Sequence, residues 1–205
     1  RGDVPVNSVD VSYEAAKGIG YIKVSKFARN TYNEFITAIA KLKQAGCTSF
    51  VIDLRGNTGG YMDAAINMIN EFMPEGRLIV YTEGKSFPRS DVYANGTGTC
   101  KDAPIVVLTD EISASASEIF SGAIQDNDRG TIIGRRTYGK GLVQTQMSLS
   151  DGSEMRLTIA RYYTPSGRCI QKKYEMGNTD DYDQDIYNRY MPVSYTHLTL
   201  PTKRI

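Results

Sequence analysis

The chain has 205 residues, with 24 basic and 23 acidic side chains and a formal net charge of +1. This length suffices for one sizeable core, and the balanced charge gives no indication of nucleic-acid binding or of attraction to an anionic membrane surface. Its three cysteines are scattered without a Cys-x-x-Cys pair, so neither a metal site nor a disulfide framework is indicated.

The first elements alternate between strand and helix patterns. Residues 20–24 alternate apolar and polar side chains, which predicts a strand. Thr31 and Glu34 have the spacing of a capping box, and the apolar stripe that follows predicts a helix that ends at Gly46. Residues 50–54 are apolar except for Asp53, and they predict a buried strand.

A glycine-rich loop, residues 55–60 (RGNTGG), separates this strand from a helix that contains Met62 and Phe72. Its spacing matches neither the G-x-G-x-x-G motif nor a phosphate-binding P-loop. Two interpretations remain open. The glycines are needed for a tight turn, or the backbone N–H of Gly59 or Gly60 supplies a donor to an oxyanion.

A long polar segment follows the strand that is predicted at residues 78–81. Residues 83–103 are rich in glycine and have no apolar periodicity. A loop of this length is uncommon unless it is functional or mobile. We therefore expect this segment to be a mobile loop that borders a substrate groove.

The turn after the next predicted strand, residues 104–109, carries alternating serines and alanines. Ser113, Ser115 and Ser117 lie where this strand gives way to a helix, whose free N–H groups could hold an oxyanion while a serine attacks a carbonyl. Ser115 and Glu118 also have the spacing of a capping box, and that structural role alone would explain both residues.

The rest of the chain adds β-structure. Residues 131–134 predict a strand, and residues 142–160 predict an antiparallel hairpin over an Asp-Gly turn. The alternation of strands and helices up to residue 133 implies βαβ crossovers, so we expect an α/β fold with a mostly parallel sheet that is covered by helices. The single histidine, His197, lies near the chain end, which excludes a core Ser-His-Asp triad.

Three segments in order resemble one family. Residues 53–60 (DLRGNTGG), 113–119 (SASASEI) and 139–144 (GKGLVQ) are similar to motifs of the C-terminal processing peptidases, or tail-specific proteases. The resemblance covers about residues 1–175. It implies a core of the Clp-protease/crotonase type and a serine peptidase with a Ser–Lys dyad, without metal or cofactor.

The resemblance also implies roles for individual residues. Ser115 corresponds to the nucleophile, Lys140 to the general base and Gln144 to the residue that orients the lysine. The backbone N–H of Ala116, with that of Gly59 or Gly60, would form the oxyanion hole.

A protonated amine cannot accept a proton, so this mechanism requires a buried Lys140. The flanking residues Tyr138, Leu142 and Val143 are compatible with an apolar site.

The expected function is hydrolysis of peptide bonds near the C-termini of polypeptide substrates, with no nucleic acid as partner. The alternatives are a non-catalytic ligand- or peptide-binding module on the same fold and a crotonase-like acyl-CoA enzyme. By resemblance, we expect a PDZ domain upstream and a periplasmic or cell-envelope location. We expect residues 1–175 to be the peptidase core, 176–192 a C-terminal extension and 193–205 a non-native tail.

Overall fold

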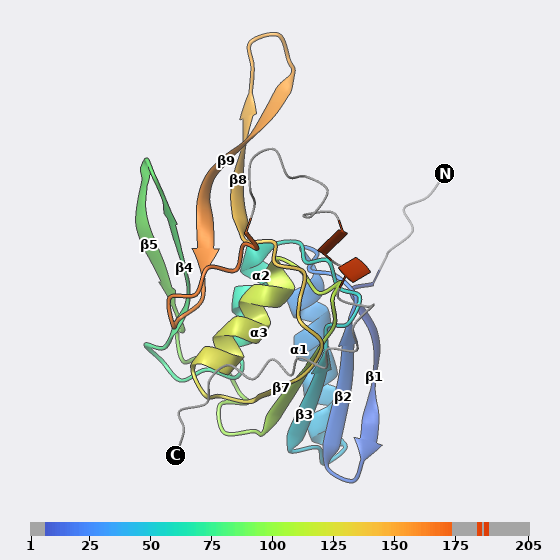
Figure 1. Cartoon of the computed structure of the whole chain (residues 1–205). Helices are drawn as coiled ribbons and strands as arrows, with labels where there is room; N and C mark the ends of the chain where they lie inside the picture. The colour runs from blue at the N-terminus through green and yellow to red at the C-terminus, as the bar shows by residue number, and fades with distance from the viewer. Residues whose placement is uncertain (1–6, 174–183, 186, 189–205) are drawn as a thin grey trace, which may run out of the picture.

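A computed structural model describes residues 7–173, 184, 185, 187 and 188. These residues form two sheets and the helices α1, α2 and α3 (Figure 1). The elements are β1 (Val9–Ala16), β2 (Ile19–Val24), α1 (Thr31–Gln44), β3 (Ser49–Asp53), α2 (Met62–Asn70), β4 (Leu78–Gly84), β5 (Phe87–Tyr93), β6 (Ile105–Thr109), α3 (Ala116–Asp126), β7 (Thr131–Gly134), β8 (Leu142–Ser148) and β9 (Glu154–Tyr163). The expected extension and tail, His197 included, lie almost wholly outside the described residues.

The larger sheet has the strand order β1-β2-β3-β6-β7. Strands β2, β3, β6 and β7 are parallel, and β1 pairs antiparallel with β2 at one edge. Because α1 follows β2 and α3 follows β6, each helix connects parallel neighbours as a βαβ crossover. The predicted mostly parallel α/β sheet is therefore confirmed, and its strands β2, β3 and β6 all end near the same edge.

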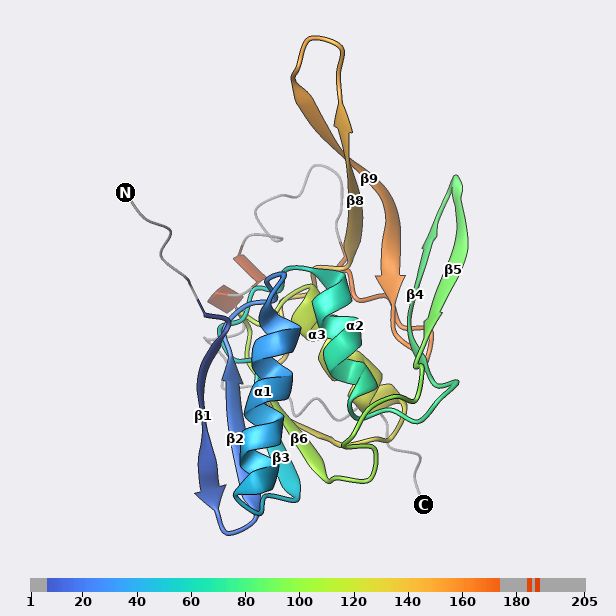
Figure 2. The same ribbon diagram turned by 180° about the vertical axis from the view of Figure 1, so that it is seen from behind.

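The core lies between this sheet and its helices, and Figure 2 shows α1 packed across the strands β1 to β3. Phe72, just beyond α2, is fully buried at its centre. Its ring makes edge contacts with Phe35 of α1, Phe50 of β3 and Phe120 of α3, at centroid separations of 6.2, 6.3 and 6.5 Å. These aromatic contacts fix the helices against β3 and β6, the strands that precede residues 55–60 and residues 110–115.

The smaller sheet is antiparallel, with the order β5-β4-β9-β8. It consists of two hairpins, β4–β5 and β8–β9, which extend away from the core (Figure 1). The β8–β9 hairpin was predicted and is confirmed, and Gly152 in its turn has a φ of +84°. The two hairpins pair with each other only where residues 81–83 meet residues 161–163.

The prediction of a loop over residues 83–103 is wrong for its first half, because Phe87–Tyr93 form strand β5. All but one of the seven β5 residues are exposed, and the strand pairs only with β4. An edge strand of this kind buries no apolar stripe and tolerates Pro88, so it lacks the sequence pattern of a buried strand.

The predicted capping box of α1 is also wrong. The N-cap is Asn30, and Thr31 is already helical. The Thr31 hydroxyl accepts the N–H of Ala28 at 2.7 Å. The carboxylate of Glu34 accepts the N–H groups of Ser8 and Val9 at 2.7 and 3.0 Å and thereby connects the helix to β1.

No helix among the described residues is both long and apolar enough to cross a membrane.

Candidate active site

The turn between β6 and α3 holds the serine that the sequence singles out. β6 ends at Thr109 and α3 begins at Ala116, so Ser115 is the residue immediately before the helix. Its backbone has a φ of 56° and a ψ of −113°, which residues other than glycine rarely adopt. Backbone strain between a strand and a helix is typical of turns that present a nucleophile at the end of a sheet.

The three serines of this turn have different surroundings. Ser113 and Ser117 are fully buried, and their hydroxyls donate to the carbonyl oxygens of Leu54 at 2.8 Å and Asn57 at 2.9 Å. Ser115 is partly exposed. Of the three hydroxyls, only that of Ser115 is therefore placed to meet a substrate.

Glu118 connects the Ser115 turn to the segment that contains Lys140. The predicted capping box is present, and the Glu118 carboxylate accepts the N–H of Ser115 at 2.9 Å. The same carboxylate accepts the N–H groups of Gly139 and Lys140 at 2.7 and 2.8 Å. Burial raises the pKa of Glu118, while its hydrogen bonds from Thr137 and the three N–H groups act in the opposite direction. The capping role and a catalytic role for Ser115 are thus compatible.

The side chains of Lys140 and Gln144 do not complete a dyad in this structure. Both residues are exposed, so the burial that a lysine base requires is not observed. Within the described part of the chain, the Lys140 amine makes no hydrogen bond to Ser115 or Gln144. Gln144 lies on β8 opposite Thr158. The main chain of Lys140 is fixed beside the Ser115 turn, but its side chain is exposed.

The last two glycines of residues 55–60, Gly59 and Gly60, differ in their backbone hydrogen bonds. Gly59 has a φ of +98°, and a Cβ on it would lie 2.8 Å from the Cβ of Ser115, so only glycine allows this approach. Its N–H donates to the side chain of Asn57 at 2.8 Å. Among the described residues, the N–H groups of Gly60 and Ala116 have no acceptor, and Ala116 begins a helix whose first N–H groups are free. The N–H of Gly60 is therefore available to a ligand, whereas that of Gly59 is already bonded.

Asn57 is a functional residue for which the sequence analysis gave no role. It is fully buried, and its amide donates to the carbonyl of Val24 at 2.9 Å. The main-chain carbonyl of Asn57 accepts the N–H of Ala114 at 3.0 Å and the hydroxyl of Ser117 at 2.9 Å. Asn57 therefore joins the glycine loop, β2 and the serine turn. The sequence feature that could have indicated this role is an asparagine two residues before a glycine, because an asparagine side chain often hydrogen-bonds the backbone two residues later in a turn.

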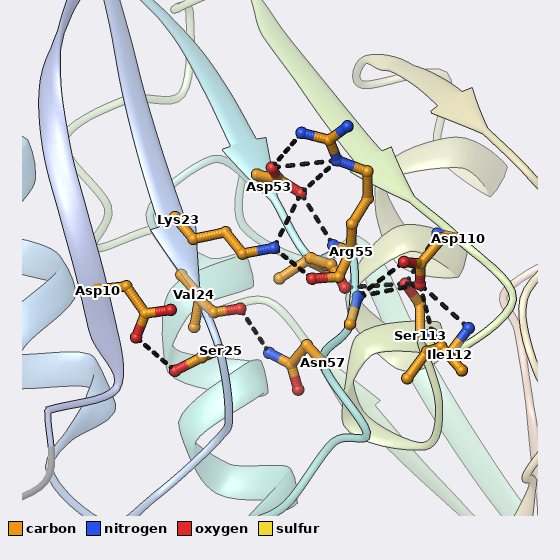
Figure 3. A network of polar contacts seen from close by, with 12 residues as sticks. Asp10, Lys23, Val24, Ser25, Asp53, Arg55, Asn57, Asp110, Ile112 and Ser113 are labelled. Carbon is orange, nitrogen blue, oxygen red and sulfur yellow. Dashed lines mark hydrogen bonds and ion pairs between the residues drawn. The ribbon is translucent and has the colours of Figure 1, made fainter.

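Asp110 makes a second connection between the two loops (Figure 3). Its carboxylate accepts the N–H of Gly56 at 2.9 and 3.0 Å. It also accepts the N–H groups of Ile112 and Ser113, both at 3.0 Å. Because Asp110 directly follows β6, the end of this strand holds the glycine loop in register with the serine turn.

The end of β3 is fixed by a buried ionic group, Asp53, which is 1% exposed. Its carboxylate accepts bonds from the guanidinium of Arg55 at 2.7 Å, with the amine of Lys23 at 3.4 Å (Figure 3). It also accepts the hydroxyl of Tyr21 at 2.5 Å. Burial alone would raise the pKa of Asp53, but these partners lower it to about 2. Burial and the bond to Asp53 raise the pKa of Tyr21 to about 12.

Taken together, these loops present a partly exposed hydroxyl with free N–H donors beside it. Such a set is suited to acyl transfer, in which the N–H groups stabilise the negative charge that develops on a carbonyl oxygen. Residues 7–173 and the four further described residues contain no group of three or more His, Cys, Asp or Glu side chains that could hold a metal ion.

Comparison with known proteins identifies close relatives. The sequence model of "Peptidase family S41" matches residues 18–184. A carboxyl-terminal-processing protease of Synechocystis sp. is 41% identical over 156 residues, which are 76% of this chain and 36% of that protein. A chloroplastic C-terminal processing peptidase of Tetradesmus obliquus is 38% identical over 77% of this chain and 34% of that protein. The chain thus spans about a third of the length of these relatives.

Solved structures agree with these matches. The photosystem II D1 C-terminal processing protease superposes with a TM-score of 0.71 and 37% identity, over 77% of this chain and 41% of that one. A lipoprotein from Streptococcus agalactiae has a TM-score of 0.61 at 17% identity, over 87% of this chain and 69% of that one, and shares the fold alone. The expected fold class is confirmed by these likenesses.

Proposed function

The chain belongs to peptidase family S41, and from this premise we propose that it is the catalytic core of a serine endopeptidase that cleaves polypeptides near their C-termini. The observation that carries the proposal is the state of Ser115. It is the one partly exposed serine of its turn, it has a φ of 56°, and it lies against Gly59 and before the free N–H of Ala116. A residue that only capped α3 would need neither the strain nor the glycine contact.

In the proposed mechanism, Ser115 Oγ attacks the carbonyl carbon of a peptide bond. Lys140 in its neutral form accepts the hydroxyl proton and later donates it to the leaving amine, and Gln144 orients the lysine amine. The N–H groups of Ala116 and Gly60 stabilise the oxyanion. Neutral Lys140 then takes a proton from a water molecule that attacks the acyl carbon, and it returns this proton to Ser115 Oγ as the ester bond breaks.

This mechanism requires the Lys140 amine to leave solvent and reach Ser115. Two features support that movement. The side chain is exposed and its aliphatic stem is flexible, while its main chain is fixed through Glu118. A polypeptide bound over Ser115 would exclude water from the amine, and desolvation favours the neutral form of an amine.

The second candidate function is a non-catalytic binding module, which the separation of the Lys140 amine from Ser115 favours. A shared fold does not by itself fix the activity. A crotonase-like enzyme fits less well, because it would need an available acidic residue beside the oxyanion donors. The nearby carboxylate of Glu118 is buried and already accepts three N–H groups.

A fluorogenic, unfolded polypeptide tests the proposal. We expect the parent chain to cleave it and Ser115→Ala to have no turnover. Ser113→Ala and Ser117→Ala should keep the chemistry but lose about 1 kcal/mol of unfolding free energy each, because each removes a buried hydrogen bond. Equal turnover in the parent and Ser115→Ala would refute the peptidase. Loss of chemistry only at Ser113 or Ser117 would refute the choice of nucleophile.

We also propose that the full-length protein carries a PDZ domain upstream of this core and acts in the periplasm or cell envelope. The support is the family membership, together with the small share of each relative that the chain spans. Fractionation of cells that express the full-length gene tests the location. Recovery of the protein in the cytoplasmic fraction would contradict it.

A further inference from the structure

A pocket of about 410 Å³ lies between α3, the segment 136–139 and the segment 164–173. Glu118 and Gly139 belong to its lining and also to the connection between Ser115 and Lys140. The pocket therefore adjoins the proposed catalytic groups. The proposed mechanism gives it no role.

Basic side chains outnumber acidic ones in the pocket lining. Arg136, Arg168, Lys172 and Lys173 contribute four positive groups, against the single carboxylate of Glu118. The oxygens of Glu118 are already bound by main-chain N–H groups. An anion that entered this pocket would thus meet a surplus of positive charge.

The four cations differ in how far they are neutralised. Arg168 pairs with Asp126 at 2.7 Å. Lys172 lies 3.5 Å from Asp185, and its amine sits over the ring of Tyr138.

By contrast, Arg136 and Lys173 are exposed, and within the described chain neither has an ion pair or hydrogen bond. Their charges remain available to a ligand, and two cations on opposite boundary segments of one pocket suit a carboxylate.

We propose that this pocket is a carboxylate-binding subsite for the polypeptide substrate, with Arg136 and Lys173 as its recognition residues. This inference rests on the proposed function, since the ligand is the polypeptide whose peptide bond Ser115 attacks. The carboxylate can come from the C-terminus of the substrate or from an Asp or Glu side chain beside the cleaved bond. The two sources have the same chemistry, and the experiment separates them.

The experiment measures binding of fluorescent peptides to the Ser115→Ala chain by anisotropy, so that no peptide is consumed. One unstructured apolar peptide is made in four forms, with a C-terminal acid or amide and with an internal Glu or Gln. We expect a form with a carboxylate to bind roughly three- to tenfold more tightly than the form without any, and added salt to reduce this preference. The form that carries the preference identifies the source.

Arg136→Gln and Lys173→Gln, singly and together in the same chain, should remove the preference and leave binding of the amide–Gln peptide unchanged. Both residues are exposed, so the variants should fold, which circular dichroism checks. The matched control is Lys17→Gln, at an exposed lysine in the turn between β1 and β2, which alters the net charge as much as each single variant. It should retain the full preference.

The outcomes distinguish the two proposals. Equal affinity for all four peptides, or a preference that survives the double variant, overturns the subsite even if the parent chain is an active peptidase. Absence of turnover by the parent chain, with a carboxylate preference that depends on Arg136 and Lys173, overturns the proposed function and retains the pocket as a binding site.

Discussion

Glu118 joins two segments that are more than twenty residues apart in the chain. Its carboxylate binds the N–H of Ser115 on one side and those of Gly139 and Lys140 on the other. The sequence does not indicate this double role, because the capping-box spacing with Ser115 is already a sufficient explanation for Glu118. The residue therefore positions the main chains of the proposed nucleophile and base relative to each other.

Replacing Glu118 with glutamine tests this positioning role. One oxygen becomes an amide NH₂ that faces N–H donors, so at least one buried donor loses its acceptor. We expect the free energy of unfolding to fall by about 1–3 kcal/mol and turnover to fall more steeply than affinity for the substrate. Urea unfolding and steady-state kinetics measure both. Glu75→Gln, at an exposed position, serves as the control, and parent-like kinetics in Glu118→Gln would contradict the role.

Lys140→Arg tests the base. Arginine keeps the charge and most of the length but cannot be deprotonated in a protein, so it cannot accept a proton from Ser115. We expect the variant to fold and to lose turnover by roughly 10²-fold or more, the usual scale of general-base catalysis. In the parent chain, turnover should rise with pH as the amine loses its proton. An arginine variant with full activity and the same pH–rate profile would show that Lys140 is not the base.

At the scale of elements, buried strands were easier to predict than exposed ones. β3 and β6 are short apolar runs, and both were located to within a residue. β5 was missed because an exposed edge strand is stabilised by backbone pairing with β4, which leaves no apolar pattern in the sequence. Contacts between distant segments also explain the wrong prediction for α1. Glu34 accepts N–H groups of residues more than twenty positions earlier, and not an N–H group at the start of its own helix.

Hydrogen exchange distinguishes the observed hairpin from the loop that the sequence indicated. Because β5 pairs only with β4, we expect its amides to alternate between slow exchange, where the N–H faces β4, and fast exchange, where it faces solvent. The exposed amides of Lys101 and Asp102 lie outside any strand and have no acceptor among the described residues, so they should exchange rapidly. Uniformly fast exchange over Phe87–Tyr93 would show that β5 is not formed in solution. The amides of the central strand β6 provide the protected reference.

For the molecule as a whole, sequence patterns predicted the α/β sheet and the family, because both follow from periodicity and from motifs that are continuous in the chain. The relation between Ser115 and Lys140 could not be predicted in the same way. Their main chains are brought together by Glu118, but the direction of an exposed lysine side chain depends on what covers it, and motif spacing carries no information on that. Asn57 was missed because its role comes from contacts with three separate segments.

The stability of the molecule in acid should depend on Asp53. Its pKa is lowered from 3.8 to about 2 in the folded chain, so at a pH between these values the unfolded chain binds a proton that the folded chain does not. The resulting stabilisation, about 2 kcal/mol by linkage, is complete above the unfolded value and is lost as pH falls through the folded value.

Asp53→Asn should therefore lower the free energy of unfolding at neutral pH and weaken its decline between about pH 5 and pH 2. Urea unfolding across this range measures the difference. Asp102→Asn, at an exposed aspartate, is the matched control and should follow the parent. If Asp53→Asn declined with acid as steeply as the parent, protonation of Asp53 would not be what destabilises the folded chain in acid.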